Sequence, residues 1–213
     1  MKKIAIVGAG GFGREVKMLI ENINERESQF EIVGFYDDKE YKGDINGVPY
    51  LGKIEKINEV DYQLGVAISI ADPETKRRIA ESITNQNIEF PNLIHPSVII
   101  GQDNVNIGKG NIICAGAIIT VDIEIEDFVI LNLSCTVGHD TKIKSYSSFM
   151  PTVNISGEVL INEGVYVGTG AKIINLLEIG EYTIVGAGAV VAKSLPAKCT
   201  AVGIPAKPIK FHE

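Results

Sequence analysis

A bulky apolar residue recurs at every sixth position through most of the C-terminal half of the chain, and this period limits the possible folds more than any other feature. A second, looser column lies two residues earlier and holds small or β-branched residues such as Val105, Ala117 and Cys135. The main column consists of Ile107, Ile113, Ile119, Ile125, Leu131, Val137, Ile143, Phe149, Ile155, Ile161, Val167, Ile173, Ile179, Val185 and Val191. A hexapeptide period is typical of a parallel β-helix, in which each hexad forms a short strand and a turn and three hexads close a coil. The fifteen hexads therefore predict about five coils, whereas the strands of a β-sandwich are not evenly spaced.

The first ninety or so residues follow a different pattern, in which short apolar runs alternate with charged, helix-favouring stretches. We expect strands at residues 3–7, 31–36 and 64–69 and helices at residues 14–23 and 74–84. Strands that alternate with helices are typical of a parallel sheet.

The helical signal ends near residue 92, after Pro91. We therefore predict a half-Rossmann-like α/β domain over residues 1–91. A β-helix domain follows over residues 92–193, and residues 194–213 form a C-terminal tail.

A glycine-rich loop at residues 8–13, Gly-Ala-Gly-Gly-Phe-Gly, follows the first predicted strand and precedes the first helix. The glycines let backbone N–H groups of this loop approach a phosphate, which the helix N-terminus then stabilises. Asp37 and Asp38 end the second strand and could accept hydrogen bonds from a sugar hydroxyl. A dinucleotide fold needs two mononucleotide halves, and this region supplies one. A nucleoside diphosphate carrying a sugar therefore fits better than NAD, and a glycine turn without a ligand is the remaining alternative.

Composition excludes several classes of partner and compartment. The 213 residues include 20 Lys and Arg against 27 Asp and Glu, a net charge of −7, which argues against a broad nucleic-acid surface or a polybasic membrane face. The chain has no apolar run long enough to span a bilayer. Cys114, Cys135 and Cys199 are odd in number and far apart, so we expect free thiols in the cytoplasm and no disulfide or metal site.

One of the three histidines is a candidate catalyst. His139 lies two residues after the inward-facing Val137, where the β-helix turns and side chains face outward. An imidazole can act as a base near neutral pH, and Asp140 could pair with it if the turn brings the two side chains together. His95 precedes Pro96 at the junction and is expected to pack there. An exposed histidine without a role is the alternative for His139.

The C-terminal segment is cationic. Between residues 182 and 212 there is no Asp or Glu, although Lys193, Lys198, Lys207 and Lys210 fall within it. Such an end suits a ligand with several phosphates, and a solvated lysine tail is the alternative.

These features together resemble a known family. The hexads, His139-Asp140 and the ending formed by residues 186–193 and 202–207 resemble the left-handed β-helix acyltransferases. With the glycine loop in front, the whole chain resembles bacterial nucleotide-sugar N-acetyltransferases, of the type that acetylates a UDP-4-amino sugar on the way to bacillosamine. The sialic acid O-acetyltransferases are similar in layout. The resemblance implies a homotrimer with acetyl-CoA in the clefts between subunits and a nucleotide-linked amino sugar as acceptor.

The resemblance also implies roles for individual residues. His139 matches the general base, Asp140 its acidic partner, Asn132 a sugar-contacting residue, and Gly157 the amide that faces the thioester carbonyl and contacts the cofactor. Ala187, Lys193 and Lys207 match the CoA contacts, and Gly10, Gly11, Asp37 and Asp38 match the nucleotide side. Two positions depart from relatives: Ser148 stands where some have a second histidine, and Asp140 stands where many have Glu.

Rival functions remain open at this point. An O-acetyltransferase acting on a sialic acid can use the same base as an N-acetyltransferase. An NAD-dependent reductase would use the glycine loop, and a non-catalytic β-helix scaffold would not need His139.

Overall fold

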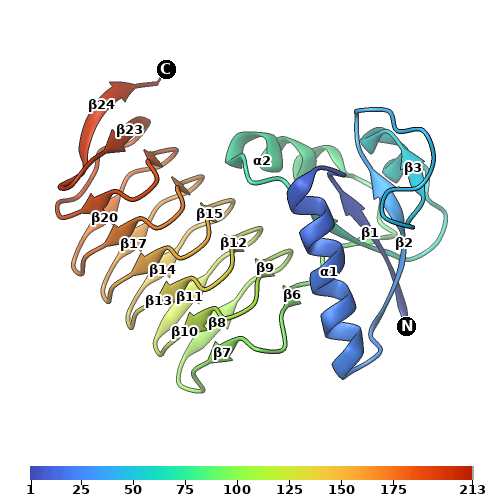
Figure 1. Ribbon diagram of the computed structural model, residues 1–213, viewed down its shortest axis with the longest axis horizontal. Coiled ribbons are helices and arrows are strands. Elements are labelled where there is room, and N and C mark those ends of the chain that lie inside the picture. Colours follow the sequence, from blue (N-terminus) through green and yellow to red (C-terminus); the bar gives the residue numbers. More distant parts are fainter. Residues whose placement is uncertain (213) are drawn as a thin grey trace.

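The structure is a computed structural model that describes residues 1–212. An N-terminal α/β region lies beside a long β-helix (Figure 1). The N-terminal sheet has five parallel strands in the order β3-β2-β1-β4-β5. Its strands are β1 (Lys2–Val7), β2 (Phe30–Tyr36), β3 (Tyr50–Gly52), β4 (Leu64–Ile68) and β5 (Ile88–Glu89). Helix α1 (Gly11–Arg26) connects β1 to β2, helix α2 (Pro73–Ser82) connects β4 to β5, and the 3-10 helix η1 (Ile54–Glu59) precedes β4.

The three predicted strands and both predicted helices of this region are confirmed. Helix α1 begins at Gly11, earlier than predicted, because the second half of the glycine loop already forms its first turn. The sequence analysis did not find β3 and β5. They have three and two residues, too few to show a period.

The β-helix has three faces, each a sheet. The first face contains β7 (Ile99–Ile100), β10 (Ile118–Ile119), β13 (Thr136–Val137), β16 (Asn154–Ile155), β19 (Lys172–Ile173) and β22 (Val190–Val191). The second contains β8 (Val105–Ile107), β11 (Ile123–Ile125), β14 (Lys142–Ile143), β17 (Leu160–Ile161) and β20 (Glu178–Ile179). The third contains β6 (Leu93–Ile94), β9 (Ile112–Ile113), β12 (Ile130–Leu131), β15 (Ser148–Phe149), β18 (Tyr166–Val167), β21 (Ile184–Val185), β23 (Cys199–Val202) and β24 (Lys207–Phe211).

Turns between the faces form three edges that run along the β-helix. Edge A joins the first face to the second and includes residues 138–141. Edge B joins the third face to the first and includes residues 132–135. Edge C joins the second face to the third and includes residues 126–129. Residues one coil apart stack along an edge, because Val137 pairs with Ile155 and each later strand of this face keeps the same offset.

The β-helix is predicted correctly, but it has more coils than the five expected, since its first face has six strands. Strands β6 and β7 precede the apolar column. Ile94 pairs with Ile113 and Ile100 with Ile119, an offset one residue longer than the regular one. One extra residue in the first coil therefore hides these two strands from the hexapeptide period.

The apolar column forms the core of the β-helix. All of its members except Ile107 are buried, and Ile107 packs against them. The second column is also inside, with Ala117 and Cys135 buried in the same cluster. The two columns together fill the interior of each coil, because protein interiors are close-packed.

The N-terminal region packs against the third face at the N-terminal end of the β-helix. Ile20 and Ile23 of α1 share a core with Ile112 and Ile130, whose side chains point outward from this face. Figure 1 shows α1 beside β6 and β9 and α2 closer to β15. This packing fixes the position of both helices relative to the β-helix.

The C-terminal segment extends the second and third faces. Leu195 forms an isolated bridge with Ile179, β23 pairs with β21, and β24 pairs antiparallel with β23. Neither α1 nor α2, the α-helices of the described residues, is long and apolar enough to cross a lipid bilayer.

Candidate active site

His139 and Asp140 form a hydrogen-bonded pair on edge A. The Nδ1 atom of His139 lies 2.8 Å from Oδ2 of Asp140, and both side chains are more than half exposed, at 57% and 56%. The pair forms although neighbours along a strand point to opposite faces, because Asp140 has a left-handed backbone conformation with φ of 57°. The same conformation recurs one coil before and after it, at Asp122 and Glu158. The regular turn of the β-helix therefore brings the two side chains together.

This arrangement suits an imidazole base. A proton on Nδ1 satisfies the contact with the Asp140 carboxylate and leaves the lone pair of Nε2 free to accept a proton. The carboxylate also fixes the orientation of the ring.

Gly157 lies directly against the imidazole, one coil beyond His139. A Cβ atom at Gly157 would come within 2.5 Å of Cε1 and 2.9 Å of Cδ2 of His139. A side chain at position 157 would therefore displace the ring. The Gly157 carbonyl accepts a hydrogen bond from the Leu176 N–H at 3.2 Å, and its own N–H has no acceptor among residues 1–212. Its predicted role toward a thioester carbonyl stays a prediction.

Asn132 is buried on edge B, separated from His139 by strand β13. Its Oδ1 accepts a hydrogen bond from the Leu133 N–H at 2.7 Å. Within one chain, the predicted sugar contact and the predicted base thus lie on different edges.

The predicted CoA residues are divided in the same way. Lys193 follows Val191 by two residues, as His139 follows Val137, so it lies on edge A with His139 and Gly157. Ala187 lies on edge B, in the turn between β21 and β22. Lys207 begins β24 next to Ala206, whose N–H donates to the Val190 carbonyl. All three residues, Ala187, Lys193 and Lys207, are exposed.

The glycine loop has the geometry that its sequence predicts. Gly8 has φ of 94°, and a Cβ at Gly13 would collide with the Gly8 carbonyl oxygen. Gly10 caps helix α1 without a side-chain hydrogen bond, and a Cβ at Gly10 or Gly11 would meet no atom within 4 Å. The helix N-terminus is therefore open to solvent at these two exposed residues.

Asp37 contributes to the loop itself. Its Oδ2 accepts a hydrogen bond from the Ala9 N–H at 2.7 Å, and its Oδ1 accepts one from the Lys39 N–H at 2.8 Å. Asp38 is exposed, and its Oδ1 accepts a longer bond, 3.3 Å, from the Ile54 N–H. Asp37 thus positions the glycine loop, and Asp38 is the freer carboxylate.

A cavity of about 540 Å³ opens at the carboxyl ends of β1, β2 and β4; we call it the strand-end cavity. Ligands of parallel α/β sheets bind at this end. Of the four predicted nucleotide residues, Asp37 and Asp38 line it, whereas Gly10 and Gly11 lie at the start of α1 outside its lining. Its lining residues are Gly8, Asp37, Asp38, Ile54, Glu55, Asn58, Ile70, Thr75, Arg78, Ile79 and Ser82.

A second, larger cavity was not predicted. This α2 cleft, of about 950 Å³, separates α2 from the third face and edge C of the β-helix. Tyr166, Tyr182 and Lys198 line it from the β-helix side, and Arg77 and Arg78 line it from α2. Neither cavity is lined by His139. No local pattern could reveal the cleft, because its two walls are about a hundred residues apart in the sequence.

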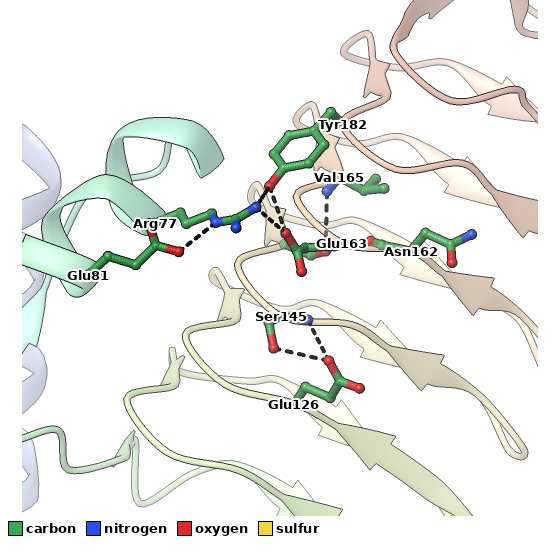
Figure 2. Close-up of polar contacts among 9 residues, drawn as sticks. Arg77, Glu81, Glu126, Ser145, Asn162, Glu163, Val165 and Tyr182 are labelled. Atoms are coloured by element: carbon green, nitrogen blue, oxygen red, sulfur yellow. Dashed lines mark hydrogen bonds and ion pairs between the residues drawn. The ribbon is translucent and has the colours of Figure 1, made fainter.

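Polar contacts of α2 with the β-helix were also missed. The Arg77 guanidinium donates to Glu163 and to the Tyr182 hydroxyl, both at 2.8 Å, and to Glu81 of its own helix (Figure 2). These carboxylates and the hydroxyl raise the pKa of Arg77 further above its ordinary value. Ser148, the departure from relatives noted above, is buried and accepts a hydrogen bond from Lys76.

Known proteins share this architecture over the full chain. Residues 3–83 match a family model described as the PglD N-terminal domain. The GDP-perosamine N-acetyltransferase of Escherichia coli O157:H7 is 32% identical over 217 aligned residues, which cover 99% of this chain and 97% of that protein.

Solved structures of acetyltransferases also match this chain over nearly its full length. A histidine-to-asparagine variant of perosamine N-acetyltransferase from Caulobacter crescentus, in complex with CoA and GDP-perosamine, matches with a TM-score of 0.87 and 27% identity, covering 99% and 98% of the two chains. The acetyltransferase domain of PglB from Neisseria gonorrhoeae FA1090, in complex with acetyl coenzyme A, matches with a TM-score of 0.88 and 31% identity, covering 98% and 99%. These similarities confirm the predicted class of enzyme, an acetyl-CoA-dependent sugar N-acetyltransferase. The chain belongs to the hexapeptide-repeat acyltransferases, in the branch of the sugar N-acetyltransferases.

Proposed function

We propose that this enzyme transfers the acetyl group of acetyl-CoA to the amine of a nucleotide-linked amino sugar, with His139 as general base. The observation that carries the proposal is the His139–Asp140 pair, with the imidazole packed on Gly157. The strand-end cavity then holds the nucleotide. Because Cys114, Cys135 and Cys199 are all free and buried, we assign the reaction to the reducing cytoplasm.

The chemistry follows from the lone pair on Nε2. The sugar amine attacks the thioester carbonyl carbon, and Nε2 of His139 accepts the proton that the nitrogen loses. Asp140 holds the opposite ring nitrogen and stabilises the imidazolium. The tetrahedral intermediate then collapses, the C–S bond breaks, and the imidazolium returns the proton to the CoA sulfur. A donor at the carbonyl oxygen, the role predicted for the Gly157 N–H, would lower the barrier by about 3 kcal/mol.

Two copies of the chain are needed to complete this site. The predicted residues divide between edge A, with His139, Gly157 and Lys193, and edge B, with Asn132 and Ala187. We infer that edge A of one subunit faces edge B of its neighbour and that acetyl-CoA lies between them. A closed ring of three straight β-helices makes three equivalent clefts of this kind.

The acceptor is chosen from the relatives. The E. coli relative is named for GDP-perosamine, and the C. crescentus structure contains GDP-perosamine and CoA. We therefore place GDP-perosamine first among candidate acceptors, with UDP- and dTDP-linked 4-amino sugars next. A sialic acid O-acetyltransferase is the alternative, because a hydroxyl acceptor can use the same base.

Mass spectrometry of the products tests the proposal. The enzyme is incubated with acetyl-CoA and each nucleotide-linked amino sugar, and with free and CMP-linked sialic acid. We expect one acetyl group to be added to one amino sugar, and His139→Ala to lower kcat by about 10²- to 10⁴-fold. His95→Ala is the matched control. His95 lies in the same β-helix, and the hydrogen bonds of its side chain are with the hydroxyl and the N–H of Ser97. Acetylation of sialic acid alone would overturn the assignment of the acceptor, and full activity of His139→Ala would overturn the assignment of the base.

A further inference from the structure

Two adjacent arginines on helix α2 have opposite surroundings. Arg77 is held by Glu81, Glu163 and Tyr182 (Figure 2). Arg78 is exposed and makes no hydrogen bond or ion pair with any of residues 1–212. The structure therefore uses Arg77 to attach α2 to the β-helix and leaves the guanidinium of Arg78 unused.

Arg78 also has a special location. It is the one residue that lines both the strand-end cavity and the α2 cleft. A ligand that extends from the ends of the sheet strands into the cleft must pass its side chain.

The charged residues that line the strand-end cavity indicate which part of a ligand Arg78 could bind. Apart from Arg78, every charged residue that lines the cavity is acidic: Asp37, Asp38 and Glu55. Carboxylates accept hydrogen bonds from ribose hydroxyls and from the N–H groups of a base, but they repel phosphates. The phosphates of a nucleotide therefore have one favourable place along this wall, at the guanidinium.

We propose that Arg78 binds the diphosphate of the nucleotide sugar at the mouth of the strand-end cavity, where this cavity meets the α2 cleft. The inference rests on the proposed function, because it takes the strand-end cavity as the nucleotide site. A guanidinium presents a planar pair of N–H donors that matches two phosphate oxygens, and it stays charged at any physiological pH. The open amides at Gly10 and Gly11 lie at the start of α1, which follows Gly8 at the carboxyl end of β1. Arg78 would then fix the diphosphate and so set the direction in which the sugar extends.

Calorimetric binding to the full-length enzyme tests this role. Wild type and Arg78→Met are titrated with GDP, UDP and dTDP, and with the corresponding nucleosides. We expect Arg78→Met to weaken binding of the preferred nucleoside diphosphate by about 10- to 100-fold and to leave nucleoside binding unchanged. Arg78→Lys should recover part of the loss. In turnover, the KM for the nucleotide sugar should rise, and the KM for acetyl-CoA and the melting temperature should not change.

Arg77→Met is the matched control, since it removes the same group from the neighbouring position. It should retain diphosphate affinity and lower the melting temperature only slightly, because the contacts of Arg77 are partly exposed. Equal weakening of nucleoside and diphosphate binding by Arg78→Met, or no weakening at all, would overturn the role of Arg78. A wild-type enzyme that binds none of the three diphosphates would instead overturn the nucleotide site of the proposed function.

Discussion

The Nζ atom of Lys76 lies 2.7 Å from the Oγ atom of Ser148, where helix α2 meets the third face of the β-helix. Both side chains are buried, with Lys76 only 1% exposed, and the Lys76 ammonium also reaches the Ser147 carbonyl at 3.3 Å. Desolvation lowers the pKa of Lys76 well below its ordinary value, and Asp72 opposes this shift only in part. A lysine therefore connects the two halves of the chain without a carboxylate in contact with it.

This burial predicts that stability rises with pH. In the unfolded chain Lys76 has an ordinary pKa of about 10.4, so between the two pKa values the unfolded state binds more protons than the folded state. The free energy of unfolding should then increase with pH, by at most about 1.4 kcal/mol per unit, until the pH reaches the unfolded pKa. Urea unfolding of wild type and Lys76→Met at pH 7 to 9.5 isolates this contribution, because other groups cancel in the difference. Parallel curves for the two proteins would show that the Lys76 pKa is ordinary.

The contact between Gly157 and the imidazole predicts a strong effect of one methyl group. Gly157→Ala should push the His139 ring out of place and lower kcat by about 10²-fold, as expected for a displacement of roughly 1 Å. The fold should persist, because Asn175 occupies the equivalent turn position one coil further. Asn175→Ala is the control and should have wild-type kcat. Steady-state kinetics measure kcat of both variants, and circular dichroism checks that both are folded. A fully active Gly157→Ala would show that a methyl group at position 157 does not displace the His139 ring.

The hydrogen bond between Asp140 and Nδ1 of His139 predicts that catalysis depends on the negative charge of Asp140 more than on the size of its side chain. Asp140→Asn keeps the size of the side chain but removes the anion that stabilises the imidazolium, so kcat should fall by about 10²-fold or more. Asp122→Asn is a matched control, because Asp122 has the same left-handed conformation one coil earlier and bonds only Asn104. Equal activity of the two variants would mean that Asp140 does not assist His139.

The ion pair of Arg77 with Glu163 should contribute little to stability although it joins distant segments. The two side chains are 44% and 39% exposed, so solvent screens their attraction. A double-mutant cycle of Arg77→Met and Glu163→Gln should give a coupling of about 0.5–1 kcal/mol. Thermal unfolding at low and high salt checks this value, and the coupling should shrink in high salt. A coupling above about 2 kcal/mol would indicate a buried, desolvated pair instead.

The sequence alone determined the repeating parts of this protein. Each coil of the β-helix touches mainly the coils next to it, so the same position in every hexad meets the same environment and carries the same kind of residue. The pair His139–Asp140 was predictable for this reason, since a regular turn determines its backbone. The glycine loop was predictable because its requirements are local: Gly8 needs a positive φ, and Gly13 has no room for a side chain.

The contacts between the N-terminal region and the β-helix could not be predicted from local patterns. Lys76 and Ser148 are 72 positions apart in the sequence, and nothing near either residue indicates that they touch. The sequence of the helix that carries Lys76 is that of an ordinary charged helix. When this helix packs against the β-helix, Arg77 bonds to Glu163 and Tyr182, and its neighbour Arg78 stays without a partner among the described residues. Local periodicity specifies the coils, but the contacts between coils and helices depend on side chains that come together only when the chain folds.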